Sequence, residues 1–225
     1  MTARIYTIGI LGGTGNLGNA LAARWAKAGH RVILGSRDAA KARQRAEEMS
    51  TTLGTEIRFG SNQDTAEQAE IIVLAVPFAN QTDAIEEVRP ALAGKILLDT
   101  TVPLLPPKVM RVQMPAEGSA AQRAQLVAGE NVRVVSAFHN VAAHKLASAH
   151  KLEGDVLVFG DDLEARKVVV ELANATGLRG LHAGALANSV AAEALTSVLI
   201  FMNKHYAADG AGIRITGELD AGKLG

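Results

Sequence analysis

The stretch Ile8-Gly9-Ile10-Leu11-Gly12-Gly13-Thr14-Gly15-Asn16-Leu17-Gly18 decides the fold. A short apolar strand runs into a glycine loop, and the loop opens a helix. Its last glycines have the spacing G-x-G-x-x-G, and Gly12 adds the looser G-x-x-G-x-x-G. A helix N-terminus carries unpaired N–H groups and a partial positive charge, so it binds phosphate. Glycine lets the backbone turn tightly and approach a pyrophosphate closely. The stretch therefore predicts a dinucleotide-binding strand–loop–helix unit.

Composition limits what else the chain can be. Its 225 residues are 48% hydrophobic and 20% charged, which is typical of one globular domain or slightly more. Lys+Arg and Asp+Glu both number 23, so the absence of net charge argues against nucleic acid or an anionic membrane as the main partner. The chain has no cysteine, which excludes disulfides, thiolate chemistry and cysteine-ligated metals.

Two further patterns bear on location. We find no apolar run of the roughly 18 residues that a membrane span needs. The N-terminal residues do not have the pattern of a signal peptide, because a strand begins almost at once. These observations predict a cytoplasmic protein with no membrane partner.

The rest of residues 1–150 alternates between strands and helices. Asp38 is expected to cap a polar helix that ends near Gly54, and a further helix is expected over Asn80–Leu92. Such alternation indicates an α/β protein with a Rossmann-type, doubly wound parallel sheet. The expected strands are Ile5–Leu11, Arg31–Leu34, Glu56–Phe59, Ile71–Val76, Lys95–Leu98 and Val132–Ala137.

Residues 151–225 have a different pattern, which predicts a small, mainly helical C-terminal domain. A strand is expected over Asp155–Phe159, and helices over Leu163–Thr176 and Leu186–His205. The second helix is so apolar that it needs a partner, which favours a homodimer. Pro103–Pro107 and Gly118–Gly129 are predicted to be mobile active-site segments.

The end of the second strand indicates which cofactor binds. An acidic residue at this position holds the ribose hydroxyls of NAD, but here the sequence is Gly35-Ser36-Arg37. Arg37 offers a forked guanidinium suited to a phosphate, and Lys41 lies one turn into the next helix. We predict a pocket for the 2′-phosphate of NADP. The alternative is a solvated, basic start of a helix.

Several kinds of active site are absent from the sequence. Four residues after Tyr6 and Tyr206 stand Ile10 and Gly210, so the Tyr-x-x-x-Lys pair of short-chain dehydrogenases is missing. There is no G-x-S-x-G elbow, and the histidines do not have H-E-x-x-H spacing, so no metal site is predicted. His139 follows a predicted strand at the edge of the sheet where ligands bind. It is a candidate for contact with substrate or nicotinamide, and the alternative is a histidine that satisfies a loop carbonyl.

Several motifs recur in order along nearly the whole chain. The most specific are the glycine loop and Gly35-Ser36-Arg37 with Lys41. The others are Val76-Pro77, Ser136-Ala137-Phe138-His139, Gly160-Asp161-Asp162 and Asn188-Ser189. In these motifs the chain resembles the NADPH-dependent reductases of the deazaflavin coenzyme F420. Asp99-Thr100-Thr101-Val102-Pro103 and Asn140-Val141-Ala142 depart from the family pattern.

The resemblance implies reversible hydride transfer between C4 of the nicotinamide and C5 of the deazaflavin, with F420 in a cleft closed by the C-terminal domain. It also implies roles for individual residues. Thr14, Gly15, Asn16 and Leu17 are expected at the pyrophosphate, Ser36, Arg37 and Lys41 at the 2′-phosphate, Phe78 and Thr82 beside the nucleotide, and His139, Val141, Ala143 and Ala211 near the nicotinamide, with His139 orienting it.

Two other functions stay open on the sequence. One is an NADP-linked reductase of an imine, a ketone or a metal complex, and the other is a regulator that senses NADP without catalysis. The deazaflavin tail is acidic, and the sequence does not choose among the cations that could meet it. These are Arg123, Lys145, Lys151, Lys204 and Arg214.

Overall fold

The strands form one sheet of eight in the order β3-β2-β1-β4-β5-β6-β7-β8. The computed structural model describes residues 4–220. Neighbouring strands run parallel except β6 and β7, which are antiparallel. The strands are β1 (Thr7–Leu11), β2 (Arg31–Gly35), β3 (Ile57–Gly60), β4 (Ile71–Leu74), β5 (Ile96–Asp99), β6 (Arg133–Ser136), β7 (Asp155–Gly160) and β8 (Arg179–His182).

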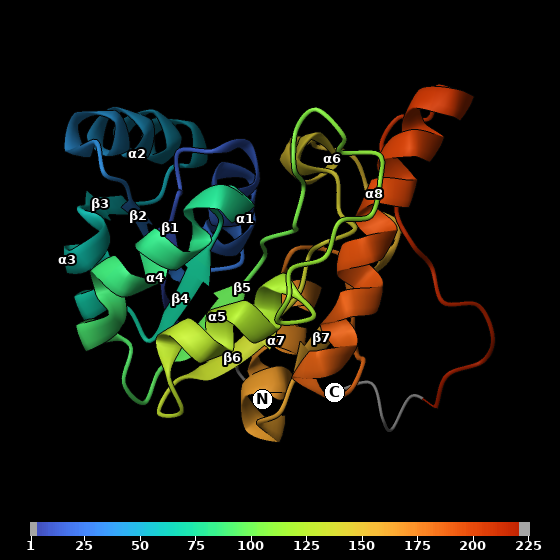
Figure 1. Ribbon diagram of the computed structural model, residues 1–225. Coiled ribbons are helices and arrows are strands. Elements are labelled where there is room, and N and C mark those ends of the chain that lie inside the picture. The colour runs from blue at the N-terminus through green and yellow to red at the C-terminus, as the bar shows by residue number, and fades with distance from the viewer. Residues whose placement is uncertain (1–3, 221–225) are drawn as a thin grey trace.

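The described part of the chain has eight α-helices, of which α1 to α7 connect strands and α8 follows the last strand (Figure 1). They are α1 (Asn16–Lys27), α2 (Ala39–Leu53), α3 (Asn62–Gln68), α4 (Gln81–Val88), α5 (Ala120–Ala128), α6 (Ala143–Ala147), α7 (Leu163–Ala175) and α8 (Ser189–Tyr206). Short 3-10 turns lie at Phe78–Asn80, Arg89–Ala91 and Leu186–Asn188.

The predicted α/β, doubly wound fold is confirmed. Every residue of β1 is buried, as expected for a parallel strand covered on both faces. β1 pairs with β2 on one side and β4 on the other, so the strand order reverses between β1 and β4. Ligands bind beyond the carboxyl ends of the strands at such a switch point. The glycine loop, which follows β1, lies there.

Two apolar cores cover the faces of the sheet. One contains side chains of α1, α2 and α7, with Trp25 fully buried. The other contains side chains of α3, α4 and α5. Trp25 Nε1 donates to the carbonyl of Leu172 at 2.9 Å, so α1 is fixed to α7. The first core therefore spans residues on both sides of position 150, and β7 and β8 extend the same sheet. The division into 1–150 and 151–225 stays a prediction.

The helix ends follow the sequence signals. Asp38 caps α2 by accepting from the Lys41 N–H at 3.1 Å, and Gly54 ends the helix with a φ of 67°, as predicted. The N-cap of α1 is Gly15, which offers no side-chain hydrogen bond. The first N–H groups of α1 are therefore left without a side-chain partner.

Some expected elements were wrong or missing. Gly118–Gly129, predicted to be a mobile active-site segment, contains helix α5 and lines neither cavity described below. Ser119 caps α5 by accepting from the Gln122 N–H at 3.0 Å, and alanines on one face of α5 are buried. The helix expected over Asn80–Leu92 is shorter, since α4 ends at Val88. The helix α3 and the strand β8 were not expected.

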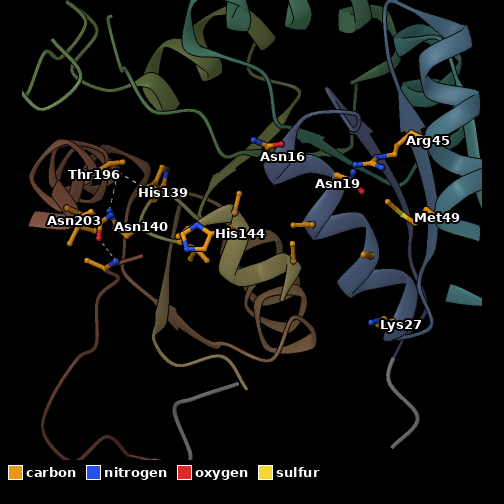
Figure 2. A pocket seen from close by; sticks show the side chains of 18 of the residues that line it. Asn16, Asn19, Lys27, Arg45, Met49, His139, Asn140, His144, Thr196 and Asn203 are labelled. Carbon is orange, nitrogen blue, oxygen red and sulfur yellow. Dashed lines mark hydrogen bonds between the residues drawn. The ribbon is translucent and has the colours of Figure 1, made fainter. Parts of the chain in front are cut away.

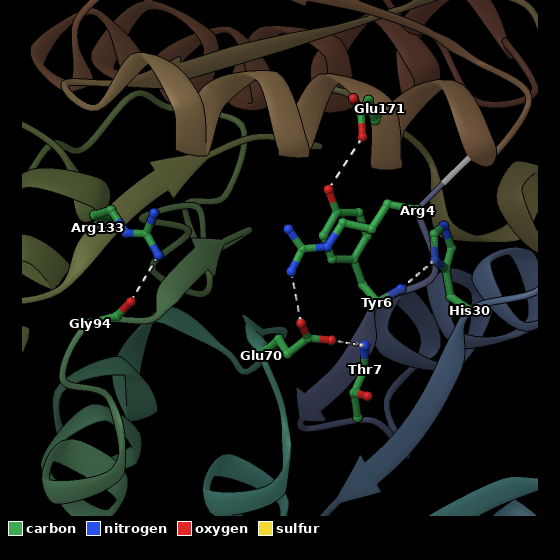
Figure 3. A network of polar contacts seen from close by, with 8 residues as sticks. All are labelled: Arg4, Tyr6, Thr7, His30, Glu70, Gly94, Arg133 and Glu171. Atoms are coloured by element: carbon green, nitrogen blue, oxygen red, sulfur yellow. Dashed lines mark hydrogen bonds and ion pairs between the residues drawn. The ribbon is translucent and has the colours of Figure 1, made fainter. Parts of the chain in front are cut away.

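Polar contacts at the amino end of the sheet fix β1 on the side away from the glycine loop (Figure 3). Glu70 accepts from the Thr7 N–H at 2.9 Å and from Arg4 at 3.1 Å. The Tyr6 hydroxyl donates to Glu171 on α7 at 3.4 Å. These contacts anchor β1 where no ligand is expected.

The C-terminal helix lies at the opposite end of the molecule from α2 and β3 (Figure 1). Contrary to the sequence analysis, Leu186–Tyr206 is long and apolar enough to span a membrane by length and composition alone. Part of this stretch is buried inside the protein, however, and it contains the buried carboxylate Glu193. An apolar helix in the core of a protein meets the same criteria of length and composition.

Candidate functional site

The glycine loop has the tight geometry that its sequence predicts. Gly12 has a φ of 77°, and a Cβ there would lie 2.7 Å from the Ala75 carbonyl oxygen on the neighbouring strand end. A Cβ at Gly18 would lie 2.7 Å from the Gly12 carbonyl oxygen. Both neighbours are backbone atoms that cannot move aside, so glycine is required at both positions. The loop thereby holds the start of α1 close to β1 and β4.

A cavity of about 490 Å³ opens beside this loop, and we call it the nucleotide cavity. It brings together Thr14 and Gly15 from the glycine loop with Ser36, Arg37 and Lys41 from the β2–α2 connection. The opposite wall comes from the β4–α4 region and includes Asn80, Asp83, Ala84 and Glu87.

The groups that line the nucleotide cavity fit a phosphorylated dinucleotide. The Ser36 hydroxyl accepts from the Asp38 N–H at 3.1 Å, and the Asp38 side chain is occupied as the cap of α2. Within residues 4–220, the charged ends of Arg37 and Lys41 have no ion-pair partner. Two free cations and the uncapped N-terminus of α1 are suited to anionic oxygens.

A second cavity, of about 970 Å³, begins at Asn16, the residue that follows the Gly15 of the nucleotide cavity, and we call it the trough. Figure 2 shows Asn16, Asn19 and Lys27 along α1, with Arg45 and Met49 from α2 on one side. His144 and Asn203 lie on the opposite side. His139 to Ala143 also line the trough, as do Thr196, Leu199 and Ile200 of α8.

The walls of the trough are tied to one another. Arg24 on α1 donates to the carbonyls of Leu146 and Ser148 at 2.8 and 2.7 Å, which fixes α6 beside α1. Asn140 donates to the Ala192 carbonyl at 2.8 Å, and Thr196 donates to the His139 carbonyl at 3.0 Å. These bonds join the segment after β6 to α8.

His139 is held rigidly at the edge of the trough. Its side chain is buried, and its Nε2 lies 2.7 Å from the Ser136 hydroxyl. Burial lowers the pKa of the imidazole to about 3, so the ring is neutral at ordinary pH. The preceding Phe138 has a φ of 68°, which is uncommon for a bulky residue. The chain therefore makes an unusual turn where His139 enters the site.

Known relatives decide the family. The family model described as NADP oxidoreductase, coenzyme F420-dependent, matches residues 7–103. The F420-dependent NADP reductase of Methanocaldococcus jannaschii is 39% identical over 219 residues, covering 93% of this chain and 97% of the relative. The chain belongs to the family of F420-dependent NADP reductases.

Further relatives agree with this membership. The F420-dependent NADP reductase of Methanothermobacter thermautotrophicus is 36% identical over 221 residues, covering 94% of this chain and 95% of the relative. A solved structure from Arthrobacter sp. FB24, provisionally described as an F420-dependent NADP reductase, has the same fold. It has a TM-score of 0.79 and 24% identity, and the match covers 93% of this chain and 99% of that one. The sequence relative agrees with the family membership, and the solved structure agrees with the fold.

Not every residue that was expected at the binding site lines a cavity. Asn16, His139, Val141, Ala143 and Ala211 line the trough. Leu17 instead packs against the apolar core. Neither Phe78 nor Thr82 lines the nucleotide cavity or the trough, and the Phe78 ring is covered by the Arg123 guanidinium at 3.7 Å from the ring centre.

Several residues that line the cavities were not expected. Asn19 lies one turn after Asn16 on the same face of α1, a spacing that the sequence contained. Thr196 and Asn203 are polar residues seven positions apart, so they share one face of the apolar helix α8, and this was a usable signal. The sequence contained no signal for Asn80 and Asp83, because their position at the nucleotide cavity depends on how α4 packs.

The polar residues Asp99, Thr100 and Thr101, which depart from the family pattern at the end of β5, are buried and line neither cavity. Asp99 accepts from the Thr101 hydroxyl at 2.7 Å and from Gln81 at 2.8 Å, and burial raises its pKa to about 7. Gln81 also accepts from Arg123 at 2.8 Å. Within residues 4–220, no three His, Asp or Glu side chains are grouped closely enough to hold a metal ion.

His139→Ala is expected to reduce turnover roughly ten- to a hundred-fold, since small misplacements of reacting groups have effects of this size. NADPH affinity should change little, because His139 lies outside the nucleotide cavity. The lowered pKa means that the imidazole stays neutral from pH 5 to 8. The pH profile of turnover should therefore have the same shape in wild type and variant.

The measurement is steady-state turnover across this pH range, with NADPH binding followed by fluorescence. His139→Asn, which retains a polar group near Ser136, is the conservative control. An ionisation near pH 6.5 that is present in wild type and lost in both variants would contradict a neutral His139.

Proposed function

We propose that NADP(H) occupies the nucleotide cavity and that the deazaflavin ring of F420 occupies the head of the trough, which is its end at Asn16. The observation that carries this proposal is the position of α1. Its N-cap, Gly15, lines the first cavity, and its first residue, Asn16, lines the second. Two ligands that fill these cavities meet at the start of this helix, at the carboxyl edge of the sheet.

In this arrangement, Arg37 and Lys41 bind the 2′-phosphate, and Thr14, Gly15 and the first N–H groups of α1 bind the pyrophosphate. The two cofactors supply the hydride chemistry when bound. The protein contributes proximity and orientation, which need no nucleophile and no metal.

The residues after β6 border the nicotinamide side of the trough in this proposal. Val141 and Ala143 offer small apolar surfaces, and both are half-buried. His139 is a positioning group, because its bond to Ser136 and the Thr196 bond to its carbonyl fix the backbone that carries them. Ala211, whose N–H donates to Asn203 at 2.6 Å, brings the C-terminal segment to the trough. We propose that residues 151–225 close the deazaflavin cleft in this way.

The experiment that tests the arrangement is reduction of F420 by NADPH, followed by bleaching of the deazaflavin absorbance. We expect bleaching with the wild-type protein. Enlarging Ala143 to Trp should stop bleaching but leave most of the NADPH affinity, since Ala143 lines the trough and the phosphates of NADPH lie in the nucleotide cavity in this proposal. Leu126→Trp, on the exposed outer face of α5, is the control. Loss of NADPH binding in the Ala143 variant would place the two ligands differently.

We further propose a cytoplasmic homodimer formed through α8. Its outer face exposes Val198, Phe201, Met202 and Tyr206, which form an apolar surface too extensive to remain solvated without cost. Light scattering should give twice the chain mass for the wild type and a single chain mass for Phe201→Glu. A monomeric wild type would contradict the dimer.

A further inference from the structure

The trough continues well beyond the site of hydride transfer. On α1 it is lined by Asn16, Asn19, Ala23 and Lys27, which are spaced three or four residues apart and so share one face of the helix. A helix rises about 1.5 Å per residue, so Lys27 lies roughly 16 Å from Asn16 along the axis. A planar ring at the head leaves this far end for another part of the ligand.

Two cations line the trough, one at its far end and one nearer its head. Lys27 and Arg45 are the only lysine and arginine that line the trough within residues 4–220. Lys27 lies in the last turn of α1 and has no ion-pair partner in the same part of the chain. Arg45 lies across from α1 on α2, and its guanidinium reaches the Asn19 side chain, whose amide oxygen can accept from it (Figure 2).

One carboxylate also lines the trough. Glu48 pairs with Arg45 at 3.1 Å and accepts from Gln44 at 2.9 Å, and these contacts lower its pKa. It therefore balances Arg45 and leaves the charge of Lys27 uncompensated. Both members of the Arg45–Glu48 pair are about half exposed, so the pair is weak and can exchange for a ligand anion.

The cations that the sequence offered for the acidic tail do not line the trough. Lys145 pairs with Asp209, and Arg123 is held by Gln81 and the Phe78 carbonyl at 2.8 Å each. Lys151 lines a separate cavity of about 420 Å³ beside Glu153 and Asp155. Lys204 and Arg214 line neither that cavity nor the trough.

We infer that Arg45, beside Asn19, and Lys27, at the far end, line an anion-binding subsite that holds the acidic tail of the deazaflavin coenzyme along the trough. This inference rests on the proposed position of the deazaflavin ring at the head of the trough. Lys27 makes the main contact because its charge is free, and Arg45 adds a second contact when the tail displaces Glu48. The subsite confers selectivity for the tailed coenzyme over the bare deazaflavin.

The test compares F420 with the same deazaflavin lacking its acidic tail as acceptors of hydride from NADPH. We expect Lys27→Ala to raise the KM for F420 about three- to tenfold, and Lys27→Ala with Arg45→Ala to raise it further, with kcat unchanged. The KM for the tail-free acceptor should stay the same in every variant. Increasing salt should raise the KM for F420 in wild type but have little effect in the double variant.

Two matched controls are available. Arg43 is on the same helix as Arg45 and pairs with Glu47 but does not line the trough, and Lys204 is a cation of α8 that also lies outside it. Arg43→Ala and Lys204→Ala should leave both KM values unchanged.

Three outcomes would overturn the inference. These are an unchanged KM for F420 in the double variant, an equal rise for both acceptors, and an equal rise in the controls. Failure of wild type to reduce either deazaflavin would instead reject the proposed function itself, so the two failures are distinguishable.

Discussion

Arg37→Ala is expected to weaken NADPH binding about 10- to 100-fold and to leave NADH binding nearly unchanged. A hydrogen bond to a charged group contributes about 1.5–3 kcal/mol, and each 1.4 kcal/mol is about tenfold in affinity. Arg37 is exposed, lines the nucleotide cavity and has no ion-pair partner within residues 4–220, so its guanidinium is free for a phosphate. The cofactor preference should therefore fall by nearly the full loss in NADPH affinity.

Isothermal titration with both nucleotides measures this preference directly. Lys41→Ala should give a smaller loss, because an ammonium forms a less directed contact with phosphate than a guanidinium. Arg43→Ala on the outer face of α2 serves as the control. Equal affinities of the wild type for NADPH and NADH would refute the assignment of the 2′-phosphate to this pocket.

Glu193→Ala is expected to lower the free energy of unfolding by about 2–4 kcal/mol. The Glu193 carboxylate is buried on α8 and accepts from the N–H groups of Ala120 and Ala121, at 2.6 and 3.1 Å, in the first turn of α5. Removing the carboxylate leaves two buried donors without a partner, and each such loss costs about 1–3 kcal/mol. For a chain of this size the melting temperature should fall by roughly 5–15 °C.

Thermal unfolding followed by circular dichroism tests this expectation. Glu193→Gln should have a smaller effect, since one amide oxygen can still accept a hydrogen bond. Glu164→Ala removes an exposed carboxylate of α7 that pairs with Lys167, and it should change the melting temperature by little. A melting temperature of Glu193→Ala within 2 °C of wild type, a margin of roughly 1 kcal/mol, would show that α8 is held by other contacts.

Local signals in the sequence predicted much of the fold. The cap at Asp38, the helix stop at Gly54 and the glycine loop all depend on residues within a few positions of one another. Helix α3 was missed because its sequence is mostly polar and its buried Thr65 and Ala66 do not form an apolar stripe. A helix of this length gains its stability from packing, which no local pattern reveals.

Local sequence signals predicted the lining residues of the nucleotide cavity better than those of the trough. Thr14, Gly15, Arg37 and Lys41 lie on two connections that follow neighbouring strands, so strand order alone brings them together. The trough has walls from α1, α2, α6 and α8, and its shape depends on how these helices pack. The Leu17 side chain packs against the core because a helix turns successive side chains by about 100°, so one residue after Asn16 the side chain no longer lines the trough.

The Trp25–Leu172 hydrogen bond has a consequence for how the two substrates communicate. It fixes α1 to α7. Because Asn16 of α1 lines the trough and its N-cap Gly15 lines the nucleotide cavity, this helix sets the spacing between two rings bound as proposed. Loosening this anchor, as in Trp25→Phe, should change the primary deuterium isotope effect on hydride transfer, because donor and acceptor would sample a wider range of separations. Affinity for each substrate measured alone would change far less.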